Sequence, residues 1–199
     1  MNPIKTVLIV LDPQNDLTSS SGKLFPATQP VLDKFNVINH INQLTDDFRH
    51  AGATIIYSPI VFSKGYPEVG NNPYGVMTSV IASEAMVKGT SGAEISQQFT
   101  MKDEDIILER SAIIAFEGTN LTQILKDKGI TTIILCGLLS DICVEGTMRA
   151  AYSKGFEVFT LIDATATLSL EKQAITLEHS YPLFSKVIKT EEALSLIKR

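Results

Sequence analysis

The sequence has few of the residues that form disulfide frameworks and metal sites, since its 199 residues include two cysteines and three histidines. Two cysteines are too few for a disulfide framework, and we expect both thiols to be reduced. His40 and His50 are ten residues apart on one expected helix, which places them on different faces, and His179 is isolated. No HExxH or CxxC spacing occurs. The sequence therefore predicts no metal site.

Long apolar runs and a surplus of basic residues are also missing. The apolar run from Val7 to Leu11 is interrupted by Asp12 before it reaches the length of a signal-peptide core or a membrane span. The net charge is −5, whereas nucleic acids and anionic membranes select basic surfaces. Neither GxGxxG nor GxxxxGK[ST] occurs, so no phosphate cradle is predicted. We expect a cytoplasmic protein that binds a small molecule, with no cofactor and no nucleic-acid or membrane partner.

The sequence does contain a repeated alternation of β-branched runs and helical stretches, which is typical of βαβ units in a mainly parallel sheet. The predicted strands are residues 6–11, 53–58, 131–135 and 156–161, with weaker candidates at 105–108 and 186–189. The chain is long enough for one domain with a full hydrophobic core and too short for two ordinary ones. We predict one domain over residues 1–199 with an α/β fold: a doubly wound, mainly parallel six-stranded sheet with helices on both faces, as in Rossmann-like proteins.

Helices are expected between these strands. They are a helix of about twenty residues ending near Gly52, residues 120–128, residues 142–154, and a last helix capped by Thr190. The connection over residues 59–92 differs, because it contains no clear strand, and long loops of this kind are usually functional or contact a partner. Within it, Val76, Val80 and Ile81 fit one face of a short helix.

Cys143 lies in the first turn of the helix that is expected to follow strand 131–135. Backbone N–H groups and the helix dipole favour a thiolate there, so we expect a lowered pKa for Cys143 and a nucleophilic role. The same N–H groups are suited to hold the oxygen of a tetrahedral intermediate. The alternative is that Cys143 is a small buried hydrophobe, the commoner fate of a free cysteine. Cys136, inside the apolar run of the strand, is interpreted as a core residue.

Asp12 and Arg110 follow two other predicted strands, at the edge of a doubly wound sheet where ligands bind. A carboxylate at this edge can act as general base and acid, and an arginine supplies a fixed positive charge. The alternative for Asp12 is a turn-capping residue before a proline. The alternative for Arg110 is a solvated or paired surface residue.

Three segments of the chain resemble the isochorismatase-like cysteine hydrolase family, which includes nicotinamidases and N-carbamoylsarcosine amidase. The segments are residues 12–16 (DPQND), 115–121 (AFEGTNL) and 137–147 (GLLSDICVEGT), and the last is the most specific. The resemblance covers nearly the whole chain. It implies that Asp12 is the acid and base and that Cys143 is the nucleophile. It further implies a cis peptide between Leu138 and Leu139 that directs the Leu139 N–H toward an oxyanion.

Two positions depart from the family pattern. Arg110 lies six residues before Phe116, where the family usually has lysine. Arginine keeps the charge that stabilises a thiolate and orients Asp12, but it cannot deprotonate. Residues 57–62 (YSPIVF) lack the Asp-x-His pair of metal-binding nicotinamidases. The chain therefore resembles the metal-free branch of the family, and nicotinamide is not the expected substrate.

The predicted function is hydrolysis of an amide-type C–N bond in a small molecule through a thioester at Cys143. Alternatives are isochorismatase-type hydrolysis of a vinyl ether, which does not need the cysteine, a non-catalytic binding protein in which Arg110 replaces the lysine, and a redox sensor at Cys143. Relatives of this fold commonly assemble, so we also expect a homo-oligomer. The residues expected to bind substrate are Gln14, Phe62, Tyr66, Tyr74 and Phe116, for which packing or a subunit contact is the alternative use.

Overall fold

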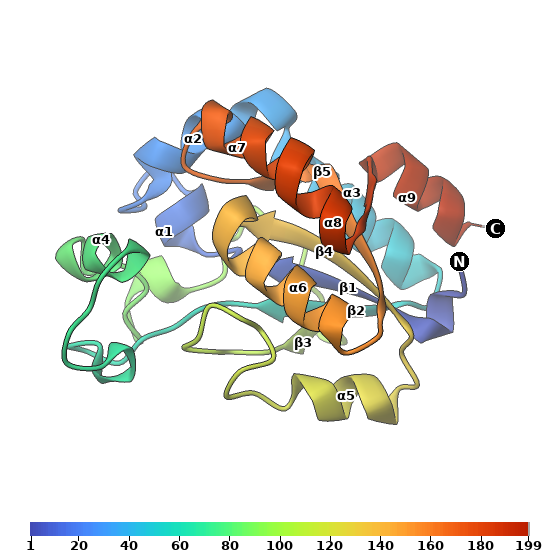
Figure 1. Cartoon of the computed structure of the whole chain (residues 1–199), viewed down its shortest axis with the longest axis horizontal. Coiled ribbons are helices and arrows are strands. Elements are labelled where there is room, and N and C mark those ends of the chain that lie inside the picture. Colours follow the sequence, from blue (N-terminus) through green and yellow to red (C-terminus); the bar gives the residue numbers. More distant parts are fainter. Residues whose placement is uncertain (199) are drawn as a thin grey trace.

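A six-stranded parallel sheet runs through the centre of the computed structural model (Figure 1). The strands are β1 (Thr6–Leu11), β2 (Thr54–Ser58), β3 (Ile106–Ile107), β4 (Thr132–Leu138), β5 (Glu157–Ala166) and β6 (Lys186–Ile188). Their order in the sheet is β3-β2-β1-β4-β5-β6, and every neighbouring pair is parallel. The sheet is doubly wound, because the chain moves outward in opposite directions from β1 and from β4, and the predicted fold is confirmed. The structure describes residues 1–198, so Arg199, at the end of the predicted domain, lies outside it.

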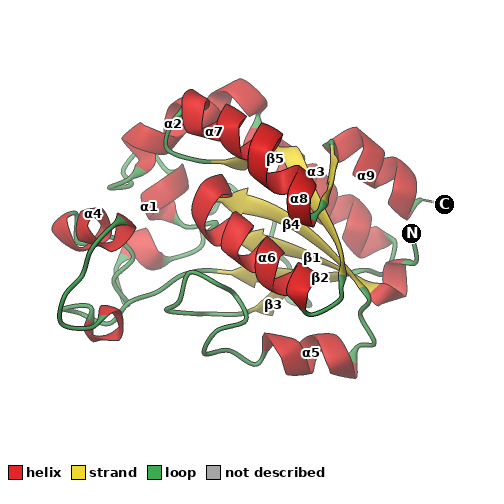
Figure 2. Ribbon diagram, viewed as in Figure 1, coloured by secondary structure: helices red, strands yellow, loops and turns green. Residues whose placement is uncertain are grey.

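Helices cover both faces of the sheet (Figure 2). The α-helices are α1 (Asn15–Thr18), α2 (Phe25–Phe35), α3 (Val37–His50), α4 (Val76–Ala82), α5 (Leu121–Asp127), α6 (Glu145–Ser153), α7 (Leu170–Ile175), α8 (Tyr181–Phe184) and α9 (Thr190–Ile197). Short 3₁₀ turns occupy Pro3–Lys5, Pro67–Val69 and Ser91–Ala93, and π-type turns occupy Ser140–Val144 and Thr176–Ser180. Within residues 1–198, none of these helices has the length and apolar composition needed to cross a membrane.

The central strand β1 is buried on both of its faces. Leu8 and Val10 pack in one apolar layer with α2, α3 and α9. Ile9 and Leu11 pack in the other layer with α5, α6 and α8. A strand in the middle of a parallel sheet meets helices on both sides, which explains why β1 is a continuous apolar run and not an alternating one. This run ends at Asp12, at the carboxyl edge of the sheet.

Several element boundaries differ from the predicted ones. The helix expected before Gly52 is two helices, because Asn36 has a left-handed φ of 50° that ends α2 and redirects the chain into α3. The helix expected over residues 142–154 begins at Glu145, since the residues before it form a π-type turn. Thr190 is the first residue of α9, and its cap is Lys189.

The long connection over residues 59–92, all of which are described, contains α4 but no strand. Its backbone joins the strand-end segment at Arg110, where the Val61 N–H donates to the Arg110 carbonyl at 2.7 Å and the Arg110 N–H donates to the Pro59 carbonyl at 3.1 Å. Within the segment, the Phe62 N–H donates to the Met86 carbonyl at 2.9 Å. The segment therefore forms one flap beside the carboxyl edge of the sheet, at the α4 end of the molecule (Figure 1).

Candidate active site

Asp12, Arg110 and Cys143 meet at the carboxyl edge of the sheet. Asp12 follows β1, Arg110 follows β3, and Cys143 lies in the π-type turn after β4. Because the carboxyl ends of parallel strands share one edge, residues that are far apart in sequence come together there. Their exposed fractions are 2%, 3% and 5%, so all three are buried. The structure thus brings together the three residues predicted to be catalytic.

The Arg110 guanidinium is committed to protein oxygen atoms through each of its three nitrogens. Nη2 donates to Oδ1 of Asp12 at 2.5 Å, and Nε donates to Oγ of Ser58 at 3.2 Å. Nη1 donates to the Ala112 carbonyl at 2.6 Å. The hydroxyl of Ser58 in turn donates to the Leu108 carbonyl at 3.0 Å. Arg110 is therefore a fixed, buried ion-pair partner of Asp12 and not a solvated surface residue.

The Asp12 carboxylate is held between Arg110 and Cys143. Burial raises the pKa of Asp12 above its ordinary value, and this effect outweighs the stabilisation of the carboxylate by Arg110 and by the neighbouring Cys143 thiol. The backbone of Asp12 has a left-handed φ of 50°, and its N–H donates to the Ser58 carbonyl at 3.1 Å. A carboxylate with a raised pKa is a stronger base than an ordinary aspartate, which suits it to accept a proton from the thiol.

The surroundings of Cys143 favour its neutral thiol over the thiolate. Burial raises its pKa, and the Asp12 carboxylate raises it further, against a smaller opposing effect of Arg110. The predicted lowering of the Cys143 pKa is therefore wrong. The physical reason is that Cys143 is removed from water and faces an anion, and these two effects exceed any stabilisation by a helix terminus. Proton transfer to the neighbouring Asp12 carboxylate offers a route to the thiolate.

The turn that carries Cys143 is fixed by side-chain hydrogen bonds to neighbouring segments. The Ser140 hydroxyl donates to the Gln173 side chain at 2.7 Å, and the Tyr181 hydroxyl donates to the Ser140 carbonyl at 3.1 Å. The Thr167 hydroxyl donates to the Asp141 carboxylate. These contacts tie the turn to the end of β5 and to α7 and α8, so the position of the Cys143 sulfur depends on elements that follow it in the chain.

The end of β4 passes unusually close to the end of β1. Gly137 has a φ of 105°, and a Cβ atom there would lie 2.1 Å from the Leu11 carbonyl oxygen, so only glycine fits. The next peptide bond, between Leu138 and Leu139, is cis, as the family resemblance implies. The Leu139 carbonyl accepts from the N–H groups of Ile142 and Val144, each at 3.1 Å. This close approach places the Cys143 turn beside Asp12.

Cys136, the second cysteine, is fully buried within β4. Its thiol donates to the Ile9 carbonyl at 3.7 Å, and burial alone raises its pKa. Cys136 is therefore a core residue, as predicted.

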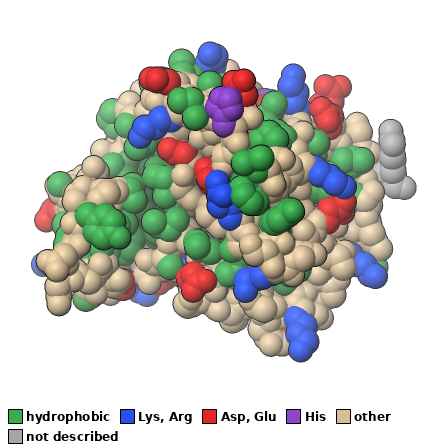
Figure 3. Space-filling view, in the orientation of Figure 1, with side chains coloured by type: hydrophobic (Ala, Val, Ile, Leu, Met, Phe, Trp, Pro, Cys, Tyr) green, Lys and Arg blue, Asp and Glu red, His purple; other side chains and the backbone are tan. Residues whose placement is uncertain are grey.

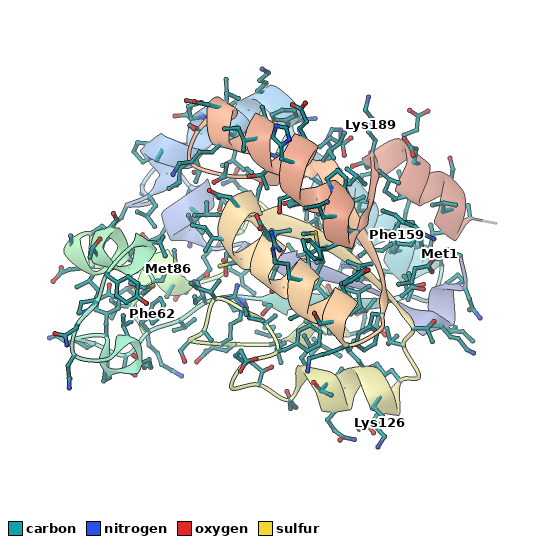
Figure 4. The ribbon with its side chains drawn as sticks, in the orientation of Figure 1. Met1, Phe62, Met86, Lys126, Phe159 and Lys189 are labelled. Carbon is teal, nitrogen blue, oxygen red and sulfur yellow. The ribbon has the colours of Figure 1, made fainter. Side chains whose placement is uncertain are left out.

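A cavity of about 60 Å³ opens beside Asp12 and Cys143. Apart from these two residues and Ser79, its lining side chains are apolar. Helix α4 forms one wall, and Phe62 and Met86 lie next to each other below this helix (Figure 4). Figure 3 shows hydrophobic side chains gathered beside the α4 end of the molecule. The flap over residues 59–92 thus builds part of the site.

Phe62 is the one residue, among the five expected to bind substrate, that lines this cavity within the described chain. Gln14 is fully buried and serves the backbone instead. Its amide donates to the carbonyls of Ile60 and Ala93, at 2.8 Å and 3.0 Å, and accepts from the Ile60 N–H at 2.9 Å. Its assignment to substrate is corrected, because these hydrogen bonds join two loops and leave the amide no role in the cavity.

The other aromatic residues expected to bind substrate also lie outside the cavity. The Tyr66 hydroxyl donates to the Ala85 carbonyl at 2.7 Å and so braces the flap. Tyr74 is 85% exposed at the tip of the flap. Phe116 belongs to the apolar layer on the α5 and α6 side of the sheet, where its ring stacks on Phe156. These three assignments are corrected, because packing and flap geometry decide the positions of the rings.

Asp16 is a site residue that the sequence reasoning missed. Its carboxylate is buried and accepts from the N–H groups of Met86 and Lys23, at 2.7 Å and 3.2 Å. A Cβ atom at Gly92 would lie 2.3 Å from this carboxylate, so the flap closes tightly around it. Asp16 therefore positions the Met86 wall of the cavity. The sequence feature that could have indicated this role is that Asp16 belongs to the same segment, residues 12–16, as Asp12.

The described part of the chain offers no group of three or more His, Cys, Asp or Glu side chains arranged to hold a metal ion. In the segment where metal-binding nicotinamidases carry their Asp-x-His pair, Ile60 and Phe62 present apolar side chains to the cavity.

Comparison with known proteins identifies the family. A family model described as "Isochorismatase domain" matches residues 6–192. The uncharacterized isochorismatase family protein YecD of Escherichia coli O157:H7 is 28% identical over 99% of this chain and 98% of that protein. The ureidoacrylate amidohydrolase RutB of Methylorubrum extorquens is 28% identical over 96% of this chain and 83% of that protein. A cysteine hydrolase from Pseudomonas syringae pv. phaseolicola shares the fold, with a TM-score of 0.87, 22% identity, and coverage of 100% and 94% of the two chains. The chain therefore belongs to the isochorismatase family and is a hydrolase of that family.

Proposed function

We propose that this hydrolase cleaves an amide-type C–N bond of a small molecule through a thioester at Cys143. The observation that carries the proposal is the buried Cys143 thiol on the same cavity wall as the buried Asp12 carboxylate, which is itself paired with Arg110. A nucleophile and a base thus share the wall of a cavity, and a fixed positive charge is paired with the base behind it. The similarity to an amidohydrolase that acts on ureidoacrylate supports a C–N bond as the target.

The first step is attack of the Cys143 sulfur on the substrate carbonyl carbon. Asp12 takes the thiol proton as the S–C bond forms, which its raised pKa favours. Arg110 keeps its positive charge throughout and stabilises whichever member of the Cys143–Asp12 pair is anionic. We assign stabilisation of the negative charge that develops on the carbonyl oxygen to the N–H of Leu139, because Leu139 and Cys143 line the same cavity.

The second step is release of the amine. The C–N bond breaks as Asp12 returns its proton to the leaving nitrogen, and an acyl thioester stays on Cys143. Water then attacks the thioester and gives a proton to Asp12. The C–S bond breaks, and Asp12 returns this proton to the sulfur. The net reaction consumes an amide and water and yields a carboxylic acid and an amine, with the protein unchanged.

A panel of small primary amides tests this proposal through the release of ammonia. We expect Cys143→Ala to abolish hydrolysis and Cys136→Ala to retain it, because Cys136 lies in the core. Mass spectrometry of a quenched reaction should detect an acyl adduct on the peptide that contains Cys143. Hydrolysis of an amide or a vinyl ether that survives in Cys143→Ala would refute the thioester mechanism.

The assembly state and the cellular compartment stay predictions. We expect a homo-oligomer in solution, by analogy with relatives of this fold. Light scattering on the purified full chain measures the mass directly, and a mass equal to that of one 21.7 kDa chain would contradict the expectation.

A further inference from the structure

We propose that the cavity selects uncharged amides with a short aliphatic acyl group and rejects substrates that carry a carboxylate. This inference rests on the proposed function, because it names the substrate class of the same site. The inference is drawn from the charges and the shape of the cavity wall. The main observation is that the cations near the cavity do not face into it.

No Lys, Arg or His side chain among residues 1–198 lines the cavity. Arg110 is the cation behind the site, and its side chain is 0% exposed. Its three nitrogens already donate to Asp12, Ser58 and the Ala112 carbonyl. Because Arg110 is buried, does not line the cavity and has its charge paired with Asp12, it is not placed to bind a substrate carboxylate.

The lysines of the flap, Lys64 and Lys88, and the neighbouring Lys23 also do not line the cavity. Lys23 donates to the Glu84 carbonyl at 2.6 Å, and Lys88 pairs with Glu109 at 2.8 Å. Lys23 and Lys64 line a separate groove on the outer side of the flap. These cations are solvated and lie outside the wall that faces Cys143, so a carboxylate inside the cavity would meet no compensating charge.

The charged group that the cavity does present is the carboxylate of Asp12. A substrate carboxylate beside it would be repelled by a like charge and would meet a mostly apolar wall. An uncharged acyl group would instead pack against Phe62, Met77, Val80 and Met86. These side chains offer dispersion contacts and no hydrogen bonds, which suits an aliphatic chain.

The size of the cavity limits the length of this acyl group. The volume of about 60 Å³ is small, so it favours a short acyl chain over a bulky one. The wall opposite Cys143 is α4, which is short and partly exposed. We therefore place the acyl chain between the Cys143 turn and α4, with the amide carbon at the sulfur.

Two matched pairs of ligands test the inference. Succinamate differs from butyramide by a carboxylate in place of the terminal methyl group, and succinic semialdehyde differs from butyraldehyde in the same way. The aldehydes add reversibly to a thiol, so calorimetry measures their binding at Cys143 without turnover, with Cys143→Ala as the control for reaction at lysines. We expect kcat/KM for butyramide to exceed that for succinamate by at least about 100-fold. We expect the affinity for butyraldehyde to exceed that for succinic semialdehyde by at least about 100-fold as well.

The outcomes separate this inference from the proposed function. Equal or reversed preference in the aldehyde pair, or in the amide pair when at least one amide is hydrolysed, overturns the inference, and so does a failure of both aldehydes to bind. If butyraldehyde binds selectively and neither amide is hydrolysed, the inference stands and the proposed function fails. If both amides are hydrolysed equally, the proposed function stands and the inference fails.

A charge placed in the cavity wall provides a second test. Met77→Lys puts a cation on the cavity side of α4, and Ala82→Lys puts the same charge on an exposed residue of the same helix outside the wall. We expect Met77→Lys to shift the preference toward succinic semialdehyde by at least about tenfold, and Ala82→Lys to leave it unchanged. Equal shifts in the two variants would contradict the assigned position of the acyl chain. Thermal melting shows whether both variants fold. If Met77→Lys does not fold, the two ligand pairs measured with the native protein decide the inference.

Discussion

The Nη2 atom of Arg110 lies 2.5 Å from Oδ1 of Asp12, in an ion pair whose side chains are 0% and 2% exposed. Such a pair is costly to break on one side, because the remaining charge is buried without a partner. Because this ion pair lies beside Cys143, a change in it should affect both the folding stability and the hydrolytic activity of the protein. The arginine also makes contacts with Ser58 and Ala112 that the single ammonium group of a lysine is unable to reproduce together.

Substitution of Arg110 should therefore affect both folding and activity. We expect Arg110→Lys to keep part of the hydrolytic activity and to lower the free energy of unfolding by about 1–3 kcal/mol, because it retains the charge and loses hydrogen bonds. Arg110→Met should cost about 3–5 kcal/mol and abolish activity, because it leaves Asp12 buried and unpaired. Urea unfolding and amide hydrolysis measure the two effects. An inert native protein that becomes active as Arg110→Lys would instead indicate a non-catalytic binding protein.

The reactivity of Cys143 toward iodoacetamide should follow its raised pKa. In the native protein, we expect labelling of Cys143 to be slow at pH 7 and to keep increasing beyond the pH at which an ordinary thiol is fully ionised. Asp12→Asn removes one cause of the raised pKa and leaves Arg110 in place. The variant should therefore label at least about tenfold faster at pH 7 while hydrolysis falls at least about 100-fold.

Peptide mass spectrometry follows the two cysteines separately. Cys136 is the internal control, because its raised pKa comes from burial alone and should not respond to Asp12→Asn. Slower labelling of Cys143 in Asp12→Asn would show that the carboxylate activates the thiol in the resting protein, contrary to this prediction.

Stability should decline with rising pH in the alkaline range. Burial raises the pKa values of Cys136, Cys143 and Tyr57, the last to about 12. The folded state therefore keeps protons that the unfolded chain releases above the ordinary pKa values of these groups. The unfolded state then binds fewer protons, so the free energy of unfolding falls as pH increases, by up to about 1.4 kcal/mol per pH unit for each group.

Removal of one such group isolates its contribution. Cys136→Ala should show a shallower loss of unfolding free energy between pH 8 and 10, measured by urea titration, although it is less stable at pH 7 because of the volume lost in the core. The same slope in Cys136→Ala and in the native protein would mean that Cys136 titrates alike in the folded and unfolded states.

Asp16 should control how well substrate binds more than how fast it reacts. Asp16→Ala leaves the buried N–H of Met86 without its acceptor, at a cost of about 1–3 kcal/mol in stability, and loosens one wall of the cavity. We expect KM to increase more than kcat decreases, and Asp16→Asn to recover part of the loss because its amide oxygen still accepts. Equal KM values in the native protein and Asp16→Ala would contradict this positioning role.

The sequence alone determined the sheet, because strand composition and breaking residues are local properties. The run from Thr6 to Leu11 is buried on both faces, and its end at Asp12 marks the edge where Arg110 and Cys143 also lie. Since parallel strands share one carboxyl edge, the three residues were predictable as neighbours without coordinates.

Only the tertiary structure decided the properties that depend on distant contacts. The pKa of Cys143 is raised because burial and the Asp12 carboxylate act on it together, and neither the extent of burial nor the distance to Asp12 is encoded by the residues next to Cys143. Likewise, Gln14 and Asp16 bind backbone groups of the flap, at Ala93 and Met86, where no periodicity in the chain predicts a contact. Local patterns depend on neighbours along the sequence, whereas desolvation and loop closure depend on which segments pack together in the fold.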